Sequence, residues 1–378
     1  MHLHDFLSGF LSYVQPSFSF LRQEIGPLTE QHEQLVMVLG MANIEAFVRN
    51  LEGLPGRPLK DRQALVRAFV AKSVLNLPTT LALIDRLSVD ATLRRLCGWE
   101  GAGAVPSEST FSRAFGEFAN SGLPSRLHEA LVVRTHKDRL VGHISRDATA
   151  IEVREKPEKS ALPAATKTSR RQRGRPKKGK EAPKKEPKRL DQQLGMTLGQ
   201  MLADLPTRCN IGAKHNAKGH MTTWIGFKLH IDSADGDIPV SCLLTSASLH
   251  DSQAALPLMA TTALRVVHCY ELMDSAYDAP QIKAKCLENG NVPIIDHRSR
   301  RGEKDEVEAE KRARRCAGAP TAEDIRYRER SGAERVNGAL KDSFGGRFVR
   351  VRGHEKVMCH LMFGVLALTV VQLLRLIA

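Results

Sequence analysis

Alternation of apolar with polar or small residues predicts a β-hairpin in the second half of this chain. Apolar side chains fall at every second position from Ile225 to Ile231, and the same period returns from Ile238 to Leu244. Asp235-Gly236 lies between the two stretches and is a common turn sequence. A period of two is typical of a strand with one buried face. The sequence therefore predicts two antiparallel strands joined by a tight turn.

Helices and further strands are predicted around this hairpin. An apolar stretch from Leu140 leads to Asp147 and is expected to form a strand that ends there. After the hairpin we expect a helix at 252–264, a strand at 266–273, a helix at 280–288, a strand at 292–295, a loop or mobile insertion at 297–315, and a helix from 327 to about 344. Mixed elements of this kind form an α/β sheet domain.

The first third of the chain has a different pattern. Residues 30–140 carry apolar positions at helical spacing, and Pro58, Pro78 and Pro106 punctuate them. Ser107 is expected to cap a short helix. Both a helix-turn-helix that reads the major groove and a plain helical bundle fit this pattern.

Residues 154–189 carry most of the net charge of the chain. They hold fifteen Lys or Arg and four Glu, a net of +11 within a whole-chain charge of +14. Five prolines and the lack of an apolar period indicate a disordered basic insert. Within it, Arg173-Gly174-Arg175-Pro176 resembles an AT-hook, which enters narrow minor grooves. We favour the alternative, a solvated run of charge that contacts phosphates without sequence preference.

Composition narrows the classes of function. The excess of positive charge suits a polyanionic partner or an anionic membrane surface, and the 5% aromatic content argues against base stacking as the main contact. The seven cysteines are odd in number, and none is in a Cys-x-x-Cys pair, which favours a reducing compartment. The apolar run 361–378 contains Gln372 and Arg375, so we expect a buried terminal helix and not a membrane span.

Three acidic residues are candidates for a metal site. Asp147 and Asp274 each follow a predicted strand, and ligands bind at this edge of open α/β sheets. Glu334 shares a polar helix stripe with Arg330 and Lys341. Phosphodiester cleavage by two Mg²⁺ ions needs a few hard oxygen ligands together with cations that bind phosphate. Each carboxylate also has an ordinary interpretation, because aspartates often end strands and a Glu among basic residues usually forms a surface ion pair.

At these residues the chain resembles a bacterial insertion-sequence transposase of the DDE class. Tyr327, Arg330, Glu334 and Lys341 match the family pattern Tyr-x-x-Arg-x-x-x-Glu-x-x-x-x-x-x-Lys at every gap. Asp274-x-x-Tyr277-Asp278 and the segment 249–252 resemble further family motifs, and the similarity extends over about residues 35–375. The chain departs from some relatives in one respect. Only 60 positions separate Asp274 from Glu334, so an inserted β-domain is not expected there.

The resemblance implies a function and a set of roles. It implies an RNase H-like catalytic core with Asp147, Asp274 and Glu334 as catalytic metal ligands, Mg²⁺ as the cofactor and Mn²⁺ as its substitute. It implies that the protein cuts and joins double-stranded DNA, acting as a homodimer on transposon ends and target DNA in the bacterial cytoplasm. Arg330 and Lys341 would contact the DNA end, and Tyr327 would position it.

These expectations divide the chain into regions. They are a helical DNA-binding domain at 1–138, the catalytic core at 139–153 and 222–350, the basic insert at 154–221, and a C-terminal helix at 351–378 that packs on the core. A catalytically inactive, domesticated DNA-binding protein is the main alternative function, and a membrane-associated basic protein is another.

Two smaller motifs have competing interpretations. Asp251 lies behind the metal ligands, or else Asp251 or Ser252 caps the helix that follows, and we favour the cap. Cys209, His215 and His220 match no standard zinc spacing, and a contact with phosphate or solvent is the better interpretation of the two histidines.

Overall fold

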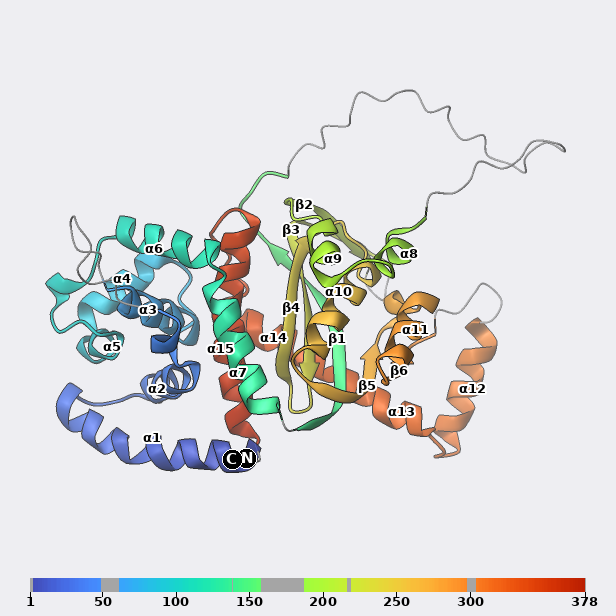
Figure 1. The fold of residues 1–378 in the computed structure, drawn as a ribbon, viewed down its shortest axis with the longest axis horizontal. Coiled ribbons are helices and arrows are strands. Elements are labelled where there is room, and N and C mark those ends of the chain that lie inside the picture. The colour runs from blue at the N-terminus through green and yellow to red at the C-terminus, as the bar shows by residue number, and fades with distance from the viewer. Residues whose placement is uncertain are drawn as a thin grey trace, which may run out of the picture.

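The computed structural model describes residues 3–48, 61–137, 139–157, 187–215, 219–297 and 304–377. A helical region and a sheet region lie side by side, with the long helix α15 (His354–Arg375) between them (Figure 1). The two described chain ends lie close together at the foot of α15. The mixed α/β class predicted from the sequence is confirmed.

Among the described residues, the helical region contains seven α-helices. These are α1 (Leu3–Ile25), α2 (Glu30–Ala42), α3 (Arg62–Val74), α4 (Thr80–Val89), α5 (Ala91–Cys97), α6 (Glu108–Asn120) and α7 (Leu123–His136). Side chains of Asp61, Thr79 and Asp90 accept backbone hydrogen bonds at the starts of α3, α4 and α5, which satisfies donors that a helix leaves free. Ser107 stands at the start of α6, but its hydroxyl makes no such cap bond.

A six-stranded sheet forms the other region. Its strands are β1 (Leu140–Glu152), β2 (Asn210–His215), β3 (Met221–Ala234), β4 (Ile238–Ser246), β5 (Val267–Met273) and β6 (Val292–Ile295). The order is β2-β3-β1-β5-β6, and β4 also pairs with β3. β3 is antiparallel to β1, β2 and β4, whereas β5 is parallel to β1 and β6 is parallel to β5. The sheet is therefore mixed, as expected of an RNase H-like core.

The predicted hairpin is present as β3 and β4. Its turn places Gly236 at φ 76° and Asp237 at φ 59°, in the left-handed region that Gly and Asp tolerate best. The alternating apolar residues Phe227, Leu229 and Ile231 are all buried. Period-two alternation located this hairpin, although helices on both faces of the sheet also bury most of the intervening positions of β3 and β4.

Helices cover both faces of the sheet. The remaining helices are α8 (Arg189–Gln193), α9 (Leu198–Asp204), α10 (Ser252–Ala263), α11 (Pro280–Glu288), α12 (Lys304–Cys316), α13 (Ala322–Tyr327) and α14 (Ser331–Ser343), with short 3-10 turns at Ile44–Ala46, Ala102–Ala104, Ser275–Tyr277 and Arg328–Arg330. α10 packs on β3 and β4, and α14 packs on β1 and β3. The apolar stripe predicted for α14 is buried, and it consists of Ala333, Val336, Leu340 and Phe344.

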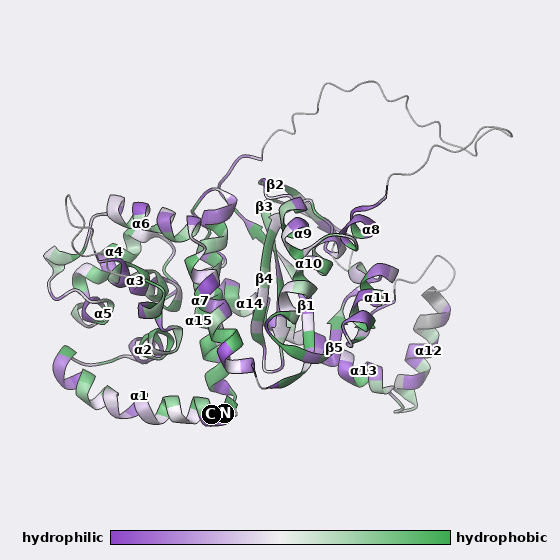
Figure 2. Ribbon diagram, in the orientation of Figure 1, coloured by the Kyte–Doolittle hydropathy of each residue, from purple (hydrophilic) through white to green (hydrophobic). Residues whose placement is uncertain are grey.

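α15 joins the two regions. It packs on β4 of the sheet and also on α2, α3, α6 and α7, so it contacts the helical region as well as the core on which it was expected to pack. It is the one helix of the described chain that is long and apolar enough to span a membrane, but 83% of its apolar window is buried inside the protein. The hydropathy colouring shows this apolar helix enclosed by the elements around it (Figure 2).

Two predicted segments differ from the structure. The second half of the predicted insert 154–221 holds α8, α9 and β2, and β2 pairs with β3 as a strand of the sheet. The sequence pattern placed β2 in the basic insert because this strand is short and contains a lysine. The predicted loop 297–315 contains the highly charged helix α12, which the lack of an apolar stripe concealed. Arg173 and Arg175, the AT-hook-like residues, lie outside the described residues.

Candidate active site

The two candidate aspartates lie side by side where the parallel pairing of β1 and β5 ends. That pairing runs from Leu140 opposite Val267 to Ser145 opposite Leu272. Carried two residues further, the same register brings Asp147 level with Asp274, which directly follows β5. The prediction that Asp147 ends its strand was wrong, because β1 continues to Glu152 in pairing with β3 alone.

Burial and mutual repulsion act on both carboxyl groups. The pKa of Asp147 is raised above its ordinary value by burial first and then by the charge of Asp274. The pKa of Asp274 is likewise raised by burial, and the charge of Asp251 adds to the shift. Arg330 and Lys214 act in the opposite direction on both groups. Burial and repulsion therefore destabilise the ionised form of both carboxyl groups, and a bound cation would stabilise it.

Asn337 holds the first aspartate in place. Its Nδ2 donates a hydrogen bond of 2.9 Å to Oδ2 of Asp147 from the helix α14 above the sheet. Asn337 itself is buried, and its Oδ1 makes no hydrogen bond with any described group. Sequence reasoning missed this residue. Its only signal was the spacing of three from Glu334, which places both side chains on neighbouring positions of one helix face.

The residues of the Tyr-Arg-Glu-Lys pattern lie along one helical path that is not a single helix. Tyr327 ends α13, Arg330 lies in the 3-10 turn that follows, and Glu334 and Lys341 belong to α14. Nη2 of Arg330 donates to Oε1 of Glu334 at 2.6 Å, and the Arg330 guanidinium lies 5.7 Å from the centre of the Tyr327 ring. The prediction of one continuous helix from Tyr327 was therefore wrong. The polar side chains Tyr327, Arg330 and Glu334 nevertheless contact one another.

The structure brings two of the three candidate carboxylates together. The Glu334 side chain is 60% exposed and is held by the ion pair to Arg330. No three His, Cys, Asp or Glu side chains among the described residues are close enough to share a metal ion. Arg330 connects the two parts of the site, since it bonds Glu334 and its charge also acts on Asp147 and Asp274.

Basic side chains border the site on the side of β2. Lys214 of this edge strand acts electrostatically on both aspartates and on Lys341. The pKa of Lys341 is lowered by burial first and then by the neighbouring Arg347. Sequence reasoning missed Lys214, because it counted that residue within the basic insert. Pairing of β2 with β3 is what brings it to the site.

The opposite face of β1 holds a fully paired charge cluster. Arg146, the neighbour of Asp147, donates from Nε and Nη2 to the two carboxylate oxygens of Asp232 at 2.8 and 2.7 Å, and from Nη1 to Oε2 of Glu271 at 2.8 Å. All three side chains are at most 1% exposed. Burial alone would raise the pKa of Glu271, but Arg146 and His268 outweigh it and lower that pKa to about 2. These bonds tie β1 to β3 and β5.

Two sequence interpretations are corrected or left open here. Asp251 stands at the start of α10, but its side chain makes no cap bond, so the favoured interpretation was wrong. Its Oδ1 accepts instead from Nζ of Lys228 at 2.8 Å, and its charge reaches Asp274. Cys209 is buried and its thiol lies near the backbone oxygen of Glu155.

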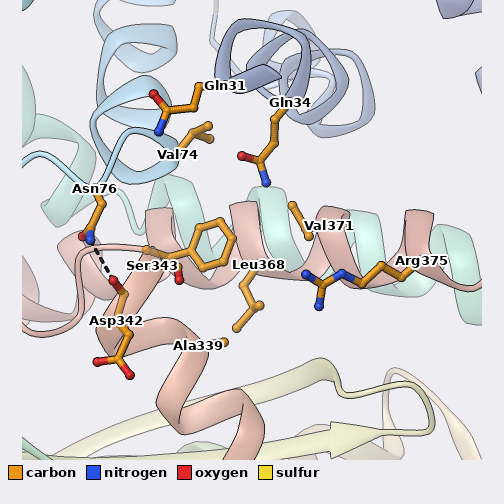
Figure 3. A pocket seen from close by; sticks show the side chains of 11 residues that line it. Gln31, Gln34, Val74, Asn76, Ala339, Asp342, Ser343, Leu368, Val371 and Arg375 are labelled. Carbon is orange, nitrogen blue, oxygen red and sulfur yellow. Dashed lines mark hydrogen bonds between the residues drawn. The ribbon is translucent and has the colours of Figure 1, made fainter. Parts of the chain in front are cut away.

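The helical region contacts the end of the active-site helix directly. A cavity of about 410 Å³ lies between α2 and α3 on one side and α14 and α15 on the other (Figure 3). Beside it, Asn76 donates from Nδ2 to the backbone oxygen of Asp342 at 2.8 Å, and its Oδ1 accepts from the backbone nitrogen of Gly345 at 3.0 Å. The helical region therefore fixes the C-terminal end of α14.

Comparison with protein families identifies both regions. Residues 143–370 match the family described as Transposase DDE domain, and residues 27–117 match the family described as Transposase domain (DUF772). No curated protein and no solved structure matches the chain. The first match spans more than half of the 378 residues and contains β1, β5 and α14, the three elements that carry the candidate carboxylates.

Proposed function

The chain belongs to the DDE transposase family, and from that premise we propose that it binds the terminal inverted repeats of its insertion sequence and catalyses strand cleavage and strand transfer there. Membership makes it a DNA transposase and a metal-dependent enzyme. The observation that carries the proposal is the pair Asp147 and Asp274, level in the register of β1 and β5, with α14, the helix that carries Glu334, packed over β1.

Asp147 and Asp274 fit a divalent cation such as Mg²⁺, with Mn²⁺ as its substitute. Their carboxylate oxygens are the hard ligands that Mg²⁺ prefers, and because burial raises both pKa values, a bound cation would stabilise the ionised form that burial disfavours. When bound, such an ion supplies activation of the attacking oxygen and stabilisation of the leaving oxygen. Asn337 would keep Asp147 oriented, and its unpaired Oδ1 is a further oxygen beside the site.

Glu334 is proposed as the third acidic residue. Its side chain is exposed and held by one ion pair, which in such a position stabilises a protein by less than about 1 kcal/mol. A DNA phosphate that engages Arg330 would compete for that guanidinium and leave Glu334 free to turn toward Asp147. Recruitment of this carboxylate is thus linked to the arrival of DNA.

The remaining cations are proposed as DNA contacts. Arg330 and Lys341 would bind phosphates of the cleaved end, and Tyr327 would position it against Arg330. Lys214 joins them because it borders the same carboxylates. Arg173 and Arg175 are proposed to hold flanking phosphates. We further propose that the helical region at 1–138 binds the terminal repeats, and that two copies act together on two DNA ends in the cytoplasm.

A catalytically inactive, DNA-binding descendant of a transposase is less well supported. Such a protein has no need to keep Asp147 and Asp274 as buried carboxylates, which burial destabilises. Replacing them would be expected to stabilise the fold, and both are present.

Substitution of Glu334 tests the catalytic assignment. Glu334→Gln is expected to abolish Mg²⁺-dependent nicking of a supercoiled plasmid that carries the ends of the element, while the affinity for the same DNA persists. Glu329→Gln is the matched control, since Glu329 is an exposed glutamate of the adjacent turn and is expected to cut normally. If Glu334→Gln cuts as well as the parent protein, the assignment of Glu334 is wrong.

A further inference from the structure

A second cavity opens on the helical region, at the junction with the segment that leads into α15. It has a volume of about 530 Å³ and lies between α3, the starts of α4 and α6, and residues 350–360. Its cationic side chains are Lys72, Arg350, Arg352 and Lys356, against a single acid, Glu108. The aspartates of the proposed active site are not among its lining residues.

Lys72 is the unusual member of this group. It lies in the last turn of α3, is 8% exposed, and lines the cavity beside Phe69. Its ammonium group forms no hydrogen bond or ion pair within the described part of the chain. Burial lowers the pKa of Lys72 to about 8. The Lys72 nitrogen is not among the enclosed polar atoms that lack a partner, so it opens onto the cavity. Burial of the rest of the side chain disfavours its charge, and an anion bound in the cavity would offset that cost.

The other polar groups of the cavity do not supply that anion. Nε2 of His360 donates to the backbone oxygen of Gly345 at 3.0 Å, and burial lowers the pKa of His360 to about 3, so the ring is neutral and adds no charge. Arg350, Arg352 and Lys356 are exposed and form no ion pair with described residues. The four cations therefore face a single carboxylate, Glu108, and the cavity has a net positive charge.

The position of the cavity connects it to the proposed active site. Lys341 lies seven residues after Glu334 on α14, about 10 Å along the helix. Arg347 lies four residues beyond the end of α14, pairs with Asp342 and acts on Lys341, and the chain then runs through Arg350 and Arg352 into the cavity. Cationic side chains therefore recur along the chain from the site to the helical region.

We propose that this cavity binds a phosphate group of the DNA backbone, held by the Lys72 ammonium that opens onto it and by Arg350, Arg352 and Lys356. This rests on the proposed function and extends it, because one DNA phosphate here would be shared between the helical region and the segment that follows α14. The chemistry of the site fits any phosphate, so DNA has to be distinguished from a free phosphate.

The test is Lys72→Met, which keeps the apolar stem and removes the charge. Binding of a short random-sequence duplex is measured by fluorescence anisotropy without metal across a range of salt. The dissociation constant is expected to rise about tenfold, as for loss of one charge-assisted hydrogen bond, and the salt slope to fall by about 0.9. Without DNA, the Tm of the same variant is expected to rise by about 1–3 °C, since a charge that burial disfavours is gone.

Two further variants make the result specific. Lys285→Met removes an equal charge from α11, away from the cavity, and is expected to change neither affinity nor salt slope. Arg350→Gln with Arg352→Gln changes only exposed side chains, so the variant keeps its Tm while its affinity for the duplex falls. A lowered affinity together with a raised or unchanged Tm cannot come from a damaged fold.

Other outcomes overturn the proposal. The proposal is wrong if Lys72→Met binds the duplex as tightly as the parent protein does. It also fails if inorganic phosphate raises the Tm of the parent protein but not of Lys72→Met, while both bind the duplex equally, since the site then takes free phosphate. Normal cutting by Glu334→Gln combined with weakened binding by Lys72→Met would refute the catalytic assignment and leave this site standing.

Discussion

The two faces of β1 carry charge in opposite ways. Arg146 and Asp147 are neighbours in the chain, and strand geometry points them to opposite faces of the sheet. On the α10 face, Arg146 is bound by Asp232 and Glu271, and every charge has a partner. On the α14 face, Asp147 and Asp274 repel each other and are held in place by neutral groups.

This difference separates a structural cluster from a functional one. A buried ion pair with complete hydrogen bonding fixes the register of three strands, and removal of one partner is costly. Buried carboxylates whose pKa stays raised despite Arg330 and Lys214 are a liability for the fold and suit a site that receives a further cation. We propose that the same strand supplies both the support of the sheet and the chemistry of the site, one residue apart.

The largest effect is expected from breaking the paired face. Arg146→Met leaves Asp232 and Glu271 buried without a cation and is expected to lower the unfolding free energy by about 3–5 kcal/mol, measured by urea denaturation. Replacing the whole cluster, with Asp232→Leu and Glu271→Met added, is expected to restore most of that loss. A single Arg146→Met variant as stable as the parent protein would show that the cluster does not support the sheet.

The unpaired face is expected to respond to divalent metal. Mn²⁺ at a hundred times its dissociation constant stabilises a protein by about 2.7 kcal/mol, and a rise in Tm is the measured quantity. Asp147→Asn is expected to remove this rise while keeping the metal-free fold. An equal rise in parent protein and variant would place the metal elsewhere.

The pH dependence of the same face has a defined sign. The pKa of Asp147 is raised in the folded state, so without metal its contribution to stability is present at acid pH and is lost as pH rises through the folded pKa. Asp147→Asn is therefore expected to flatten the fall in stability above the ordinary aspartate range. Metal binding, which needs the ionised carboxylate, runs in the opposite direction and strengthens as pH rises.

A smaller effect is expected from the neutral support of Asp147. Asn337→Ala removes the 2.9 Å hydrogen bond and is expected to weaken Mn²⁺ binding about tenfold, measured by calorimetry, with a matching loss of cleavage rate. Asn289→Ala, at an exposed amide that ends α11, serves as the control. Unchanged Mn²⁺ affinity in Asn337→Ala would limit this residue to packing.

Local patterns in the sequence determined much of the fold. The bounds predicted for α11 and β6 match the structure, and those of α10 and β5 agree within one residue. The hairpin of β3 and β4 followed from period two, and the buried stripe of α14 followed from helical spacing. These elements could be predicted because their apolar residues recur at the period of a strand or of a helix, although β4 is buried on both of its faces.

Tertiary structure alone decided the composition of the candidate site. Asp147 lies inside β1 because β1 pairs with β3 beyond the point where its pairing with β5 ends. In that part of β1, which is hydrogen-bonded on one side only, no apolar period marks the strand in the sequence. Lys214 and Asn337 reach Asp147 from an edge strand and a helix that are distant in the chain. Lys72 is one more position of a largely apolar helix in the sequence, and only the packing of α3 on α15 shows that its side chain is buried and lines a cavity. Sequence patterns indicate which face of a helix or strand is buried. Which charged side chains come into contact depends on how the helices and strands pack against one another.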